Sequence, residues 1–162
     1  MKTLIVYYSM SGNCEETAAK IAAVSGADTL RIVPVTAYPD KGLKKFLWGG
    51  KSAVMGETPA LEPYDPDLDA YDRVVIGFPV WASRPAPPIK SFIGQHKDEL
   101  RSKRISVFAC MAGSGAEKAI ERLKEMIGTE ELEAQMILTD PKGKDISDDI
   151  AEFCARIGGS AV

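Results

Sequence analysis

The chain has 162 residues, of which 45% are hydrophobic and 27% are charged. This length matches one domain of roughly 100 to 200 residues, and the apolar fraction excludes a disordered chain. Lysine and arginine number 20 against 23 aspartates and glutamates, which gives a formal net charge of -3 and no nucleic-acid-binding footprint. We therefore expect a single domain over residues 1–162 that has no nucleic-acid partner.

Neither a membrane helix nor a secretory signal is predicted. The longest apolar run, residues 74–82, is interrupted by Gly77 and Pro79 and is shorter than the roughly 20 residues that a membrane helix needs. The N-terminal apolar run covers only residues 3–8, which is too short for the core of a signal peptide. We expect a cytoplasmic protein with no membrane partner.

The three cysteines, Cys14, Cys110 and Cys154, form no Cys-x-x-Cys pair, and His96 is the single histidine. A disulfide framework or a zinc site would need paired cysteines or cysteine–histidine clusters at short spacing. We therefore expect neither of them, and no metal site.

Short apolar strands and amphipathic helices alternate along the chain. Strands are predicted at residues 2–8, 29–32, 73–78, 104–110 and 132–138. Helices are predicted at residues 14–25, from 87, from 114 and across 146–157. This alternation predicts an α/β fold, a doubly wound five-stranded parallel sheet with strand order 2-1-3-4-5.

Residues 34–72 form a long connection between the second and third strands. A basic aromatic patch lies within it at residues 41–48, and a structureless loop of this length is uncommon in a compact domain. We therefore expect an extra helix between about residues 40 and 54. It would serve as a lid or docking surface beside the ligand, or else pack on the domain's own edge.

Three loops meet where the strand order of such a sheet reverses, beyond the carboxyl ends of the strands, and this is where ligands bind. They are residues 9–14, 79–88 and 111–115. The first loop carries the hydroxyls of Ser9 and Ser11 and leads into a helix N-terminus, whose free amides suit a phosphate. An ordinary strand-to-helix turn, with Ser11 or Asn13 as the N-cap, is the alternative.

The composition of the first loop narrows the ligand class. It contains no lysine and no G-x-x-x-x-G-K-[ST] motif, and G-x-G-x-x-G is absent after the first strand. A magnesium-bound triphosphate and a dinucleotide are therefore disfavoured, and we expect a monophosphate held by hydroxyls and amides with no fixed cation. A receiver domain is disfavoured because Tyr8-Ser9 and Gly77-Phe78 stand where its acidic residues would lie.

The other two loops supply an aromatic ring and close backbone approach. Trp81 in the second loop can stack on a flat heterocycle at the rim of the site, or else pack on a neighbouring helix. The third loop has small residues, which let the backbone come close to a ligand.

Together these loops resemble those of the flavodoxin family, and the resemblance covers essentially the whole chain. The family's phosphate loop is T/S-x-T-G-N-T, and residues 9–14 resemble it, with Cys14 in place of its last threonine. The runs at residues 38–39, 48–51, 79–82 and 113–115 are similar to a bacterial flavodoxin-like subgroup of the short-chain type. The resemblance implies flavin mononucleotide (FMN) as the cofactor.

The resemblance also implies that flavin contacts come from all three loops and that the chain has no catalytic residue of its own. The implied cofactor-binding residues are Ser9, Met10, Ser11, Gly12, Asn13, Cys14, Pro79, Val80, Trp81, Ala82, Met111, Ala112, Gly113, Ser114 and Gly115. Since a thiol's pKa can fall at a helix N-terminus, Cys14 is compatible with a phosphate contact or with an oxidation sensor.

The function implied is electron transfer through bound FMN. The alternatives are an NAD(P)H-dependent flavin, quinone or nitro-compound oxidoreductase of the same fold, and a non-redox binding module. The partners would be a redox protein, or NAD(P)H with a small electron acceptor, and the chain would be a monomer or a homodimer. The second loop carries Arg84 and no acid, which favours the reductase because a cation stabilises the reduced flavin.

Overall fold

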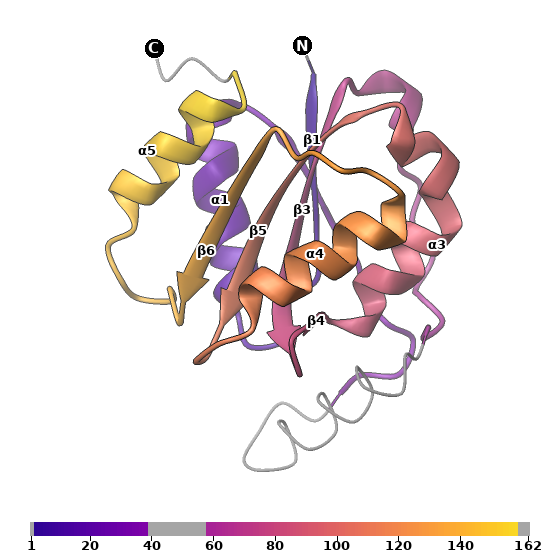
Figure 1. The fold of residues 1–162 in the computed structure, drawn as a ribbon, viewed down its shortest axis with the longest axis horizontal. Helices are drawn as coiled ribbons and strands as arrows, with labels where there is room; N and C mark the ends of the chain where they lie inside the picture. The colour runs from indigo at the N-terminus through magenta and orange to yellow at the C-terminus, as the bar shows by residue number, and fades with distance from the viewer. Residues whose placement is uncertain (1, 39–57, 159–162) are drawn as a thin grey trace.

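A five-stranded parallel sheet forms the centre of the molecule in the computed structural model, which describes residues 2–38 and 58–158 (Figure 1). Its strands are β1 (Thr3–Tyr7), β2 (Asp28–Arg31), β3 (Arg73–Trp81), β5 (Arg104–Met111) and β6 (Ala134–Thr139). They lie in the order β2-β1-β3-β5-β6 and all pair in parallel. Counted without the short strand β4 (Arg84–Pro85), this is the predicted order 2-1-3-4-5, so the predicted fold is confirmed.

Two pairs of helices cover the two faces of the sheet (Figure 1). Helices α1 (Asn13–Ser25) and α5 (Ser147–Arg156) lie side by side on one face. Helices α3 (Pro87–Arg101) and α4 (Ala116–Ile127) lie together on the other. Both faces are therefore covered, which is why the central strands are nearly continuous apolar runs.

Alternate residues of the central strands pack in two separate apolar clusters, as the two-residue period of a strand requires. In β1, Leu4 and Val6 pack in the cluster under α3 and α4. Ile5 and Tyr7 pack in the cluster under α1 and α5. The carboxyl ends of the strands are thus held between two packed layers, which fixes the loops that follow them.

A sixth strand, β4 (Arg84–Pro85), was not predicted from the sequence. It pairs antiparallel with the end of β3, with Trp81 opposite Arg84. Strand β3 therefore continues three residues beyond the predicted end at residue 78 and turns back as a hairpin. The predicted strand stopped before Pro79, a residue that lacks the N–H that a sheet normally uses.

The connection from residue 34 to residue 72 is described only in part. It holds an isolated bridge between Pro34 and Leu61 and a short 3-10 helix, η1 (Leu68–Ala70). The helix predicted between about residues 40 and 54 lies outside the described residues. Within residues 2–38 and 58–158, no helix is long and apolar enough to cross a membrane.

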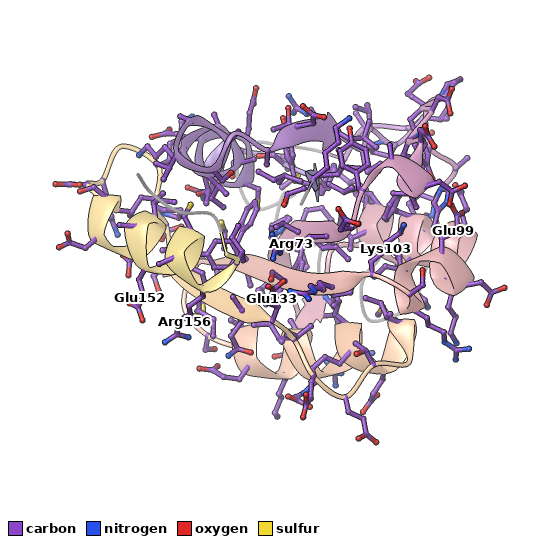
Figure 2. The ribbon with its side chains drawn as sticks, turned by 90° about the horizontal axis from the view of Figure 1, so that it is seen from above. Arg73, Glu99, Lys103, Glu133, Glu152 and Arg156 are labelled. Atoms are coloured by element: carbon purple, nitrogen blue, oxygen red, sulfur yellow. The ribbon has the colours of Figure 1, made fainter. Side chains whose placement is uncertain are left out.

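A buried ion pair joins the amino ends of the strands, at the edge of the sheet opposite the candidate site (Figure 2). The Arg73 Nε and Nη2 atoms donate to the two carboxylate oxygens of Glu133 at 2.6 and 2.7 Å. The Arg73 Nη1 atom donates to Thr3 Oγ1 at 3.2 Å. One guanidinium thus connects the starts of β1 and β3 with the residue that precedes β6.

Candidate functional site

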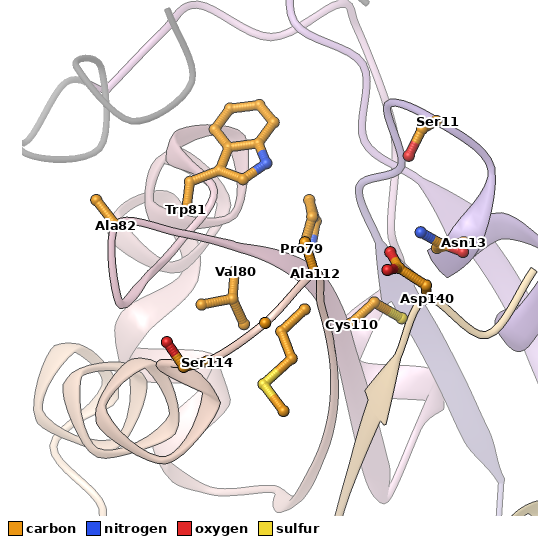
Figure 3. Close-up of a pocket in the computed structure, with 12 residues that line it drawn as sticks. Ser11, Asn13, Pro79, Val80, Trp81, Ala82, Cys110, Ala112, Ser114 and Asp140 are labelled. Carbon is orange, nitrogen blue, oxygen red and sulfur yellow. The ribbon is translucent and has the colours of Figure 1, made fainter. Parts of the chain in front are cut away.

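An open cleft of about 290 Å³ lies at the carboxyl ends of the strands, where the strand order reverses between β1 and β3 (Figure 3). Loops after β1, β3, β5 and β6 all contribute to its walls. The lining residues are Ser11, Asn13, Pro79, Val80, Trp81, Ala82, Cys110, Met111, Ala112, Gly113, Ser114 and Asp140. The cleft is close in size to small-molecule sites, which start at roughly 300 Å³.

The structure therefore brings the three predicted loops together around one cleft. Five of the predicted binding residues do not line it: Ser9, Met10, Gly12, Cys14 and Gly115. Ser9 and Met10 instead line an adjacent hollow of about 180 Å³, together with Arg31 and Tyr38. Ligand contact by each of the predicted residues stays a prediction.

The first loop presents an uncapped helix N-terminus. Gly12 is the N-cap of α1 with a φ of 98°, a left-handed conformation that favours glycine, and no side chain caps the helix. The first helical bond runs from the Glu16 N–H to the Gly12 carbonyl, so the amides of residues 13–15 have no partner within the helix. The alternative that Ser11 or Asn13 is the N-cap is wrong, and the amides are available to an anion.

Ser9 carries a buried hydroxyl in the same loop. Its side chain is 4% exposed, and its Oγ atom has no hydrogen-bond partner among the described residues. The Ser9 carbonyl accepts a hydrogen bond from Arg31 Nη2 at 3.0 Å. An unsatisfied buried hydroxyl next to free helix amides fits a ligand that supplies acceptor oxygens.

Lys142, in the loop after β6, gives this site a cation that the sequence analysis did not expect. Its Nζ atom donates to the Ser11 carbonyl at 3.2 Å, and its backbone N–H donates to Asn13 Oδ1 at 2.9 Å. Lys142 is not among the residues that line the cleft, and a monophosphate held without a fixed cation stays a prediction. The lysine was missed because it lies more than a hundred residues from the loop that it contacts.

The indole ring of Trp81 lines the cleft and is held by two tyrosines. Its ring meets Tyr8 edge-on at a centroid distance of 5.8 Å and Tyr38 edge-on at 5.1 Å. Burial raises the pKa of Tyr8 well above its ordinary value of 10.0, so this phenol stays neutral. The indole is thus fixed by aromatic contacts while it remains partly exposed to the cleft.

Backbone strain is concentrated at the rim of the cleft. Among the described residues, the non-glycine positions with positive φ are Ala82 at 52°, Ser83 at 58° and Asp140 at 40°. Ala82 and Ser83 form the two-residue turn between β3 and β4, where a positive φ at both positions is typical of a type I′ hairpin. Such strain is found most often at functional sites, where the surrounding packing maintains it.

The hairpin is fixed to the third loop and to α4. A Cβ atom on Gly115 would lie 2.6 Å from Ser83 Oγ, so only glycine permits this approach. Arg122 of α4 donates from Nη1 to the Ser83 carbonyl at 2.7 Å. Gly115 therefore contributes to the site indirectly, because it allows the β3–β4 hairpin to pack beside the third loop.

Cys14 does not line the cleft. Its side chain is 1% exposed and lies in the core beside Cys110, and burial raises the pKa of the Cys14 thiol well above its ordinary value of 9.0. Desolvation disfavours the thiolate at this position, which opposes the lowering of the pKa that a helix N-terminus can produce.

Two lining residues, Cys110 and Asp140, were not predicted from the sequence. Asp140 directly follows the fifth parallel strand, so the rule that ligands bind at the carboxyl ends of strands would have found it. Arg84, expected near the ligand, is not among the lining residues, and its Nε atom is buried without a described partner. The cleft thus carries a carboxylate and lacks the expected guanidinium.

The described residues hold no cluster of ligands suited to a metal ion.

The sequence matches a protein-family model described as Flavodoxin over residues 2–153. No curated protein matches the chain significantly. Many solved structures do match, which allows the fold to be compared in detail.

A flavoprotein from Lactobacillus acidophilus NCFM, solved in complex with FMN, is 23% identical with a TM-score of 0.74, and the match covers 94% of this chain and 97% of that chain. A protein from Bacteroides eggerthii DSM 20697 that is provisionally assigned as a flavoprotein is 23% identical with a TM-score of 0.76, over 97% and 98% of the two chains. The two-electron reduced flavodoxin of Megasphaera elsdenii is 18% identical with a TM-score of 0.60, over 98% and 97%. At these identities the likeness shows the shared fold.

Proposed function

Because the chain belongs to the flavodoxin family, we propose that it is an electron-transfer protein that binds FMN in the cleft. The observation that carries this proposal is the position of an uncapped helix start and an indole ring at the same end of one parallel sheet. A phosphate and a flat heterocycle are the two ends of FMN. The bound cofactor supplies the redox chemistry, and the protein binds and orients it.

The first loop holds the phosphate in this proposal. The amides of residues 13–15 have no helical partner, and the positive end of the α1 dipole lies at the same point. The buried Ser9 hydroxyl and the Ser11 hydroxyl add donors from the loop itself. These groups suit a dianionic oxygen ligand, because every one of them can donate a hydrogen bond.

The second and third loops hold the flavin ring. Trp81 presents an aromatic surface to the cleft (Figure 3). Met111, at the start of the third loop, also lines the cleft. The loop from Ala112 to Ser114 brings backbone close to the same space. The lining thus combines apolar side chains that suit the ring with polar groups that suit the phosphate.

Two features favour an electron carrier over an NAD(P)H-dependent reductase. Asp140 lines the cleft, and a carboxylate there opposes the negative charge of the fully reduced cofactor. Arg84, whose charge favoured the reductase, is not among the lining residues. The physiological partner in this proposal is a redox protein that docks at the open side of the cleft.

The test is to titrate the full-length chain with FMN and then to measure electron transfer. We expect a bound-flavin absorbance spectrum, quenched flavin fluorescence, and reduction and reoxidation by one-electron protein partners. NADH and NADPH oxidation with quinones is measured in parallel. Fast NAD(P)H oxidation that depends on bound FMN would support the reductase instead, and failure to bind FMN would overturn both assignments.

A further inference from the structure

We propose that Lys142 is the counter-charge of the flavin phosphate and makes the site selective for FMN over unphosphorylated riboflavin. This inference rests on the proposed function, because it assigns a residue to the phosphate of the proposed cofactor. Lys142 lies in the loop between β6 and α5. The proposed phosphate site therefore includes a fourth loop in addition to the three that were expected.

The ammonium group of Lys142 lies at the first loop itself. Its Nζ atom is 3.2 Å from the Ser11 carbonyl, and a Cβ atom on Gly12 would lie 3.1 Å from Nζ. Glycine at the N-cap therefore leaves room for the lysine to cross the start of α1. An ammonium at this point adds its charge to the positive end of the helix dipole.

The loop that carries Lys142 is fixed to α1 by several contacts. The Lys142 N–H donates to Asn13 Oδ1 at 2.9 Å, and the Gly143 N–H donates to Glu16 Oε1 at 3.3 Å. Lys20 donates to the Lys144 carbonyl at 3.4 Å. These hydrogen bonds hold the backbone of the loop against α1. The Lys142 side chain therefore starts from a fixed point near the first loop.

Nearby acids are engaged by other cations. Glu15 pairs with Arg31 at 3.2 Å, and Glu16 pairs with Lys20 at 3.3 Å. Lys142 takes part in no ion pair with any residue that the structure describes. Its charge acts on Glu16 only as the smallest of the causes that lower the pKa of that carboxyl. A cation that contacts the first loop without a close ion pair is suited to a charge-assisted hydrogen bond with an incoming phosphate.

The experiment compares FMN and riboflavin binding to the full-length chain by fluorescence titration at low and high salt. The variant is Lys142→Gln, and the matched control is Lys144→Gln, which removes the same charge from the same loop. Lys144 Nζ contacts the Thr139 carbonyl at 3.0 Å rather than the phosphate loop. Lys142→Arg serves as the charge-conserving variant.

We expect Lys142→Gln to weaken FMN binding roughly three- to tenfold at low salt. The lower value applies if solvent screens the exposed lysine strongly. Riboflavin binding changes little, the difference from wild type shrinks at high salt, and Lys142→Arg restores most of the selectivity for FMN. Inorganic phosphate competes with FMN less well in the Lys142→Gln variant than in wild type.

An unchanged ratio of FMN to riboflavin affinity in Lys142→Gln would overturn the inference while leaving the proposed function intact. Equal losses in Lys142→Gln and Lys144→Gln would also overturn it, because only the net charge would then matter. Wild-type protein that binds neither flavin would overturn the proposed function itself, so the two failures are distinguishable.

Discussion

The ring of Trp81 meets the ring of Tyr38 edge-on, with the two centroids 5.1 Å apart and an interplanar angle of 74°. Tyr38 follows β2, and Trp81 ends β3, so the contact joins segments from two sides of β1. Tyr8 supports the indole in the same way from the end of β1. An indole held by two edge contacts has its orientation fixed before any ligand binds, which reduces the entropy lost on stacking.

Replacement of Trp81 by alanine tests this arrangement. We expect wild-type protein to quench the fluorescence of bound flavin strongly, and Trp81→Ala to restore part of it. FMN affinity should fall roughly tenfold, because stacking is worth about 0.5–1.5 kcal/mol beyond the apolar area that is lost. Tyr64→Ala is the control, since Tyr64 packs against Phe92 and His96. Equal emission and affinity in Trp81→Ala and wild type would remove Trp81 from the flavin site.

Ser9 and Ser106 offer a matched pair for the phosphate site, because both carry a buried hydroxyl without a described hydrogen-bond partner. Ser9→Ala should leave the stability of the flavin-free chain unchanged or slightly higher, since no bond within the protein is lost. FMN binding should weaken roughly tenfold while riboflavin binding does not. Ser106→Ala, in the middle of β5, should affect neither ligand. A Ser9→Ala variant that binds FMN as wild type does would show that this hydroxyl does not contact the phosphate.

The fold and the three loops could be predicted because each depends on local pattern. Apolar runs of strand length alternate with helical periodicity, and a parallel sheet places the loops after its strands at one edge. The position of Trp81 in the cleft follows from its place after the third strand. None of these inferences requires knowledge of a contact between distant side chains.

The rest of the site depends on tertiary packing that no local pattern reveals. Lys142 contacts Ser11 only because the loop after β6 folds back over the start of α1. Cys14 packs in the apolar cluster under α1 and α5, and this placement depends on how α1 is rotated on the sheet. The two turn residues between β3 and β4 are Ala82 and Ser83. A type I′ hairpin is normally recognised in a sequence by an Asn-Gly pair, which is absent at this turn.

The buried Cys14 thiol predicts a loss of stability at alkaline pH. Its folded-state pKa is raised by burial, so the unfolded chain releases the proton above its ordinary value of 9.0 while the folded chain keeps it. The stabilisation is therefore fully present below that value and is lost as the pH rises above it. Denaturant unfolding at about pH 8 and about pH 10 should show a smaller fall in the free energy of unfolding for Cys14→Ala than for wild type. An identical fall in both proteins would contradict the prediction.

The ion pair between Arg73 and Glu133 predicts a large stability effect far from the cleft. The side chains are only 5% and 20% exposed, so Glu133→Ala leaves a buried guanidinium without its partner at a cost of about 3 kcal/mol. The exposed pair between Glu152 and Arg156 is the control, and Glu152→Ala should have little effect on unfolding (Figure 2). Flavin affinity of folded Glu133→Ala protein should equal that of wild type. Similar unfolding midpoints for the two variants would show that the buried pair is not a major contributor.

Asp140 is expected to lower the potential at which bound flavin accepts its second electron. Its carboxylate lines the cleft, and a negative charge there disfavours the extra negative charge of the fully reduced cofactor. Asp140→Asn keeps the size of the side chain and removes the charge, so the second potential should rise while the FMN affinity of the oxidised protein changes little. Arg84→Gln is the informative comparison, because the sequence alone placed the dominant charge there, whereas the structure leaves Arg84 out of the lining. A stepwise anaerobic redox titration measures both variants at low ionic strength, where screening is weakest. A larger shift of the second-electron potential for Arg84→Gln than for Asp140→Asn would mean that the guanidinium sets this potential. That result would favour the reductase hypothesis.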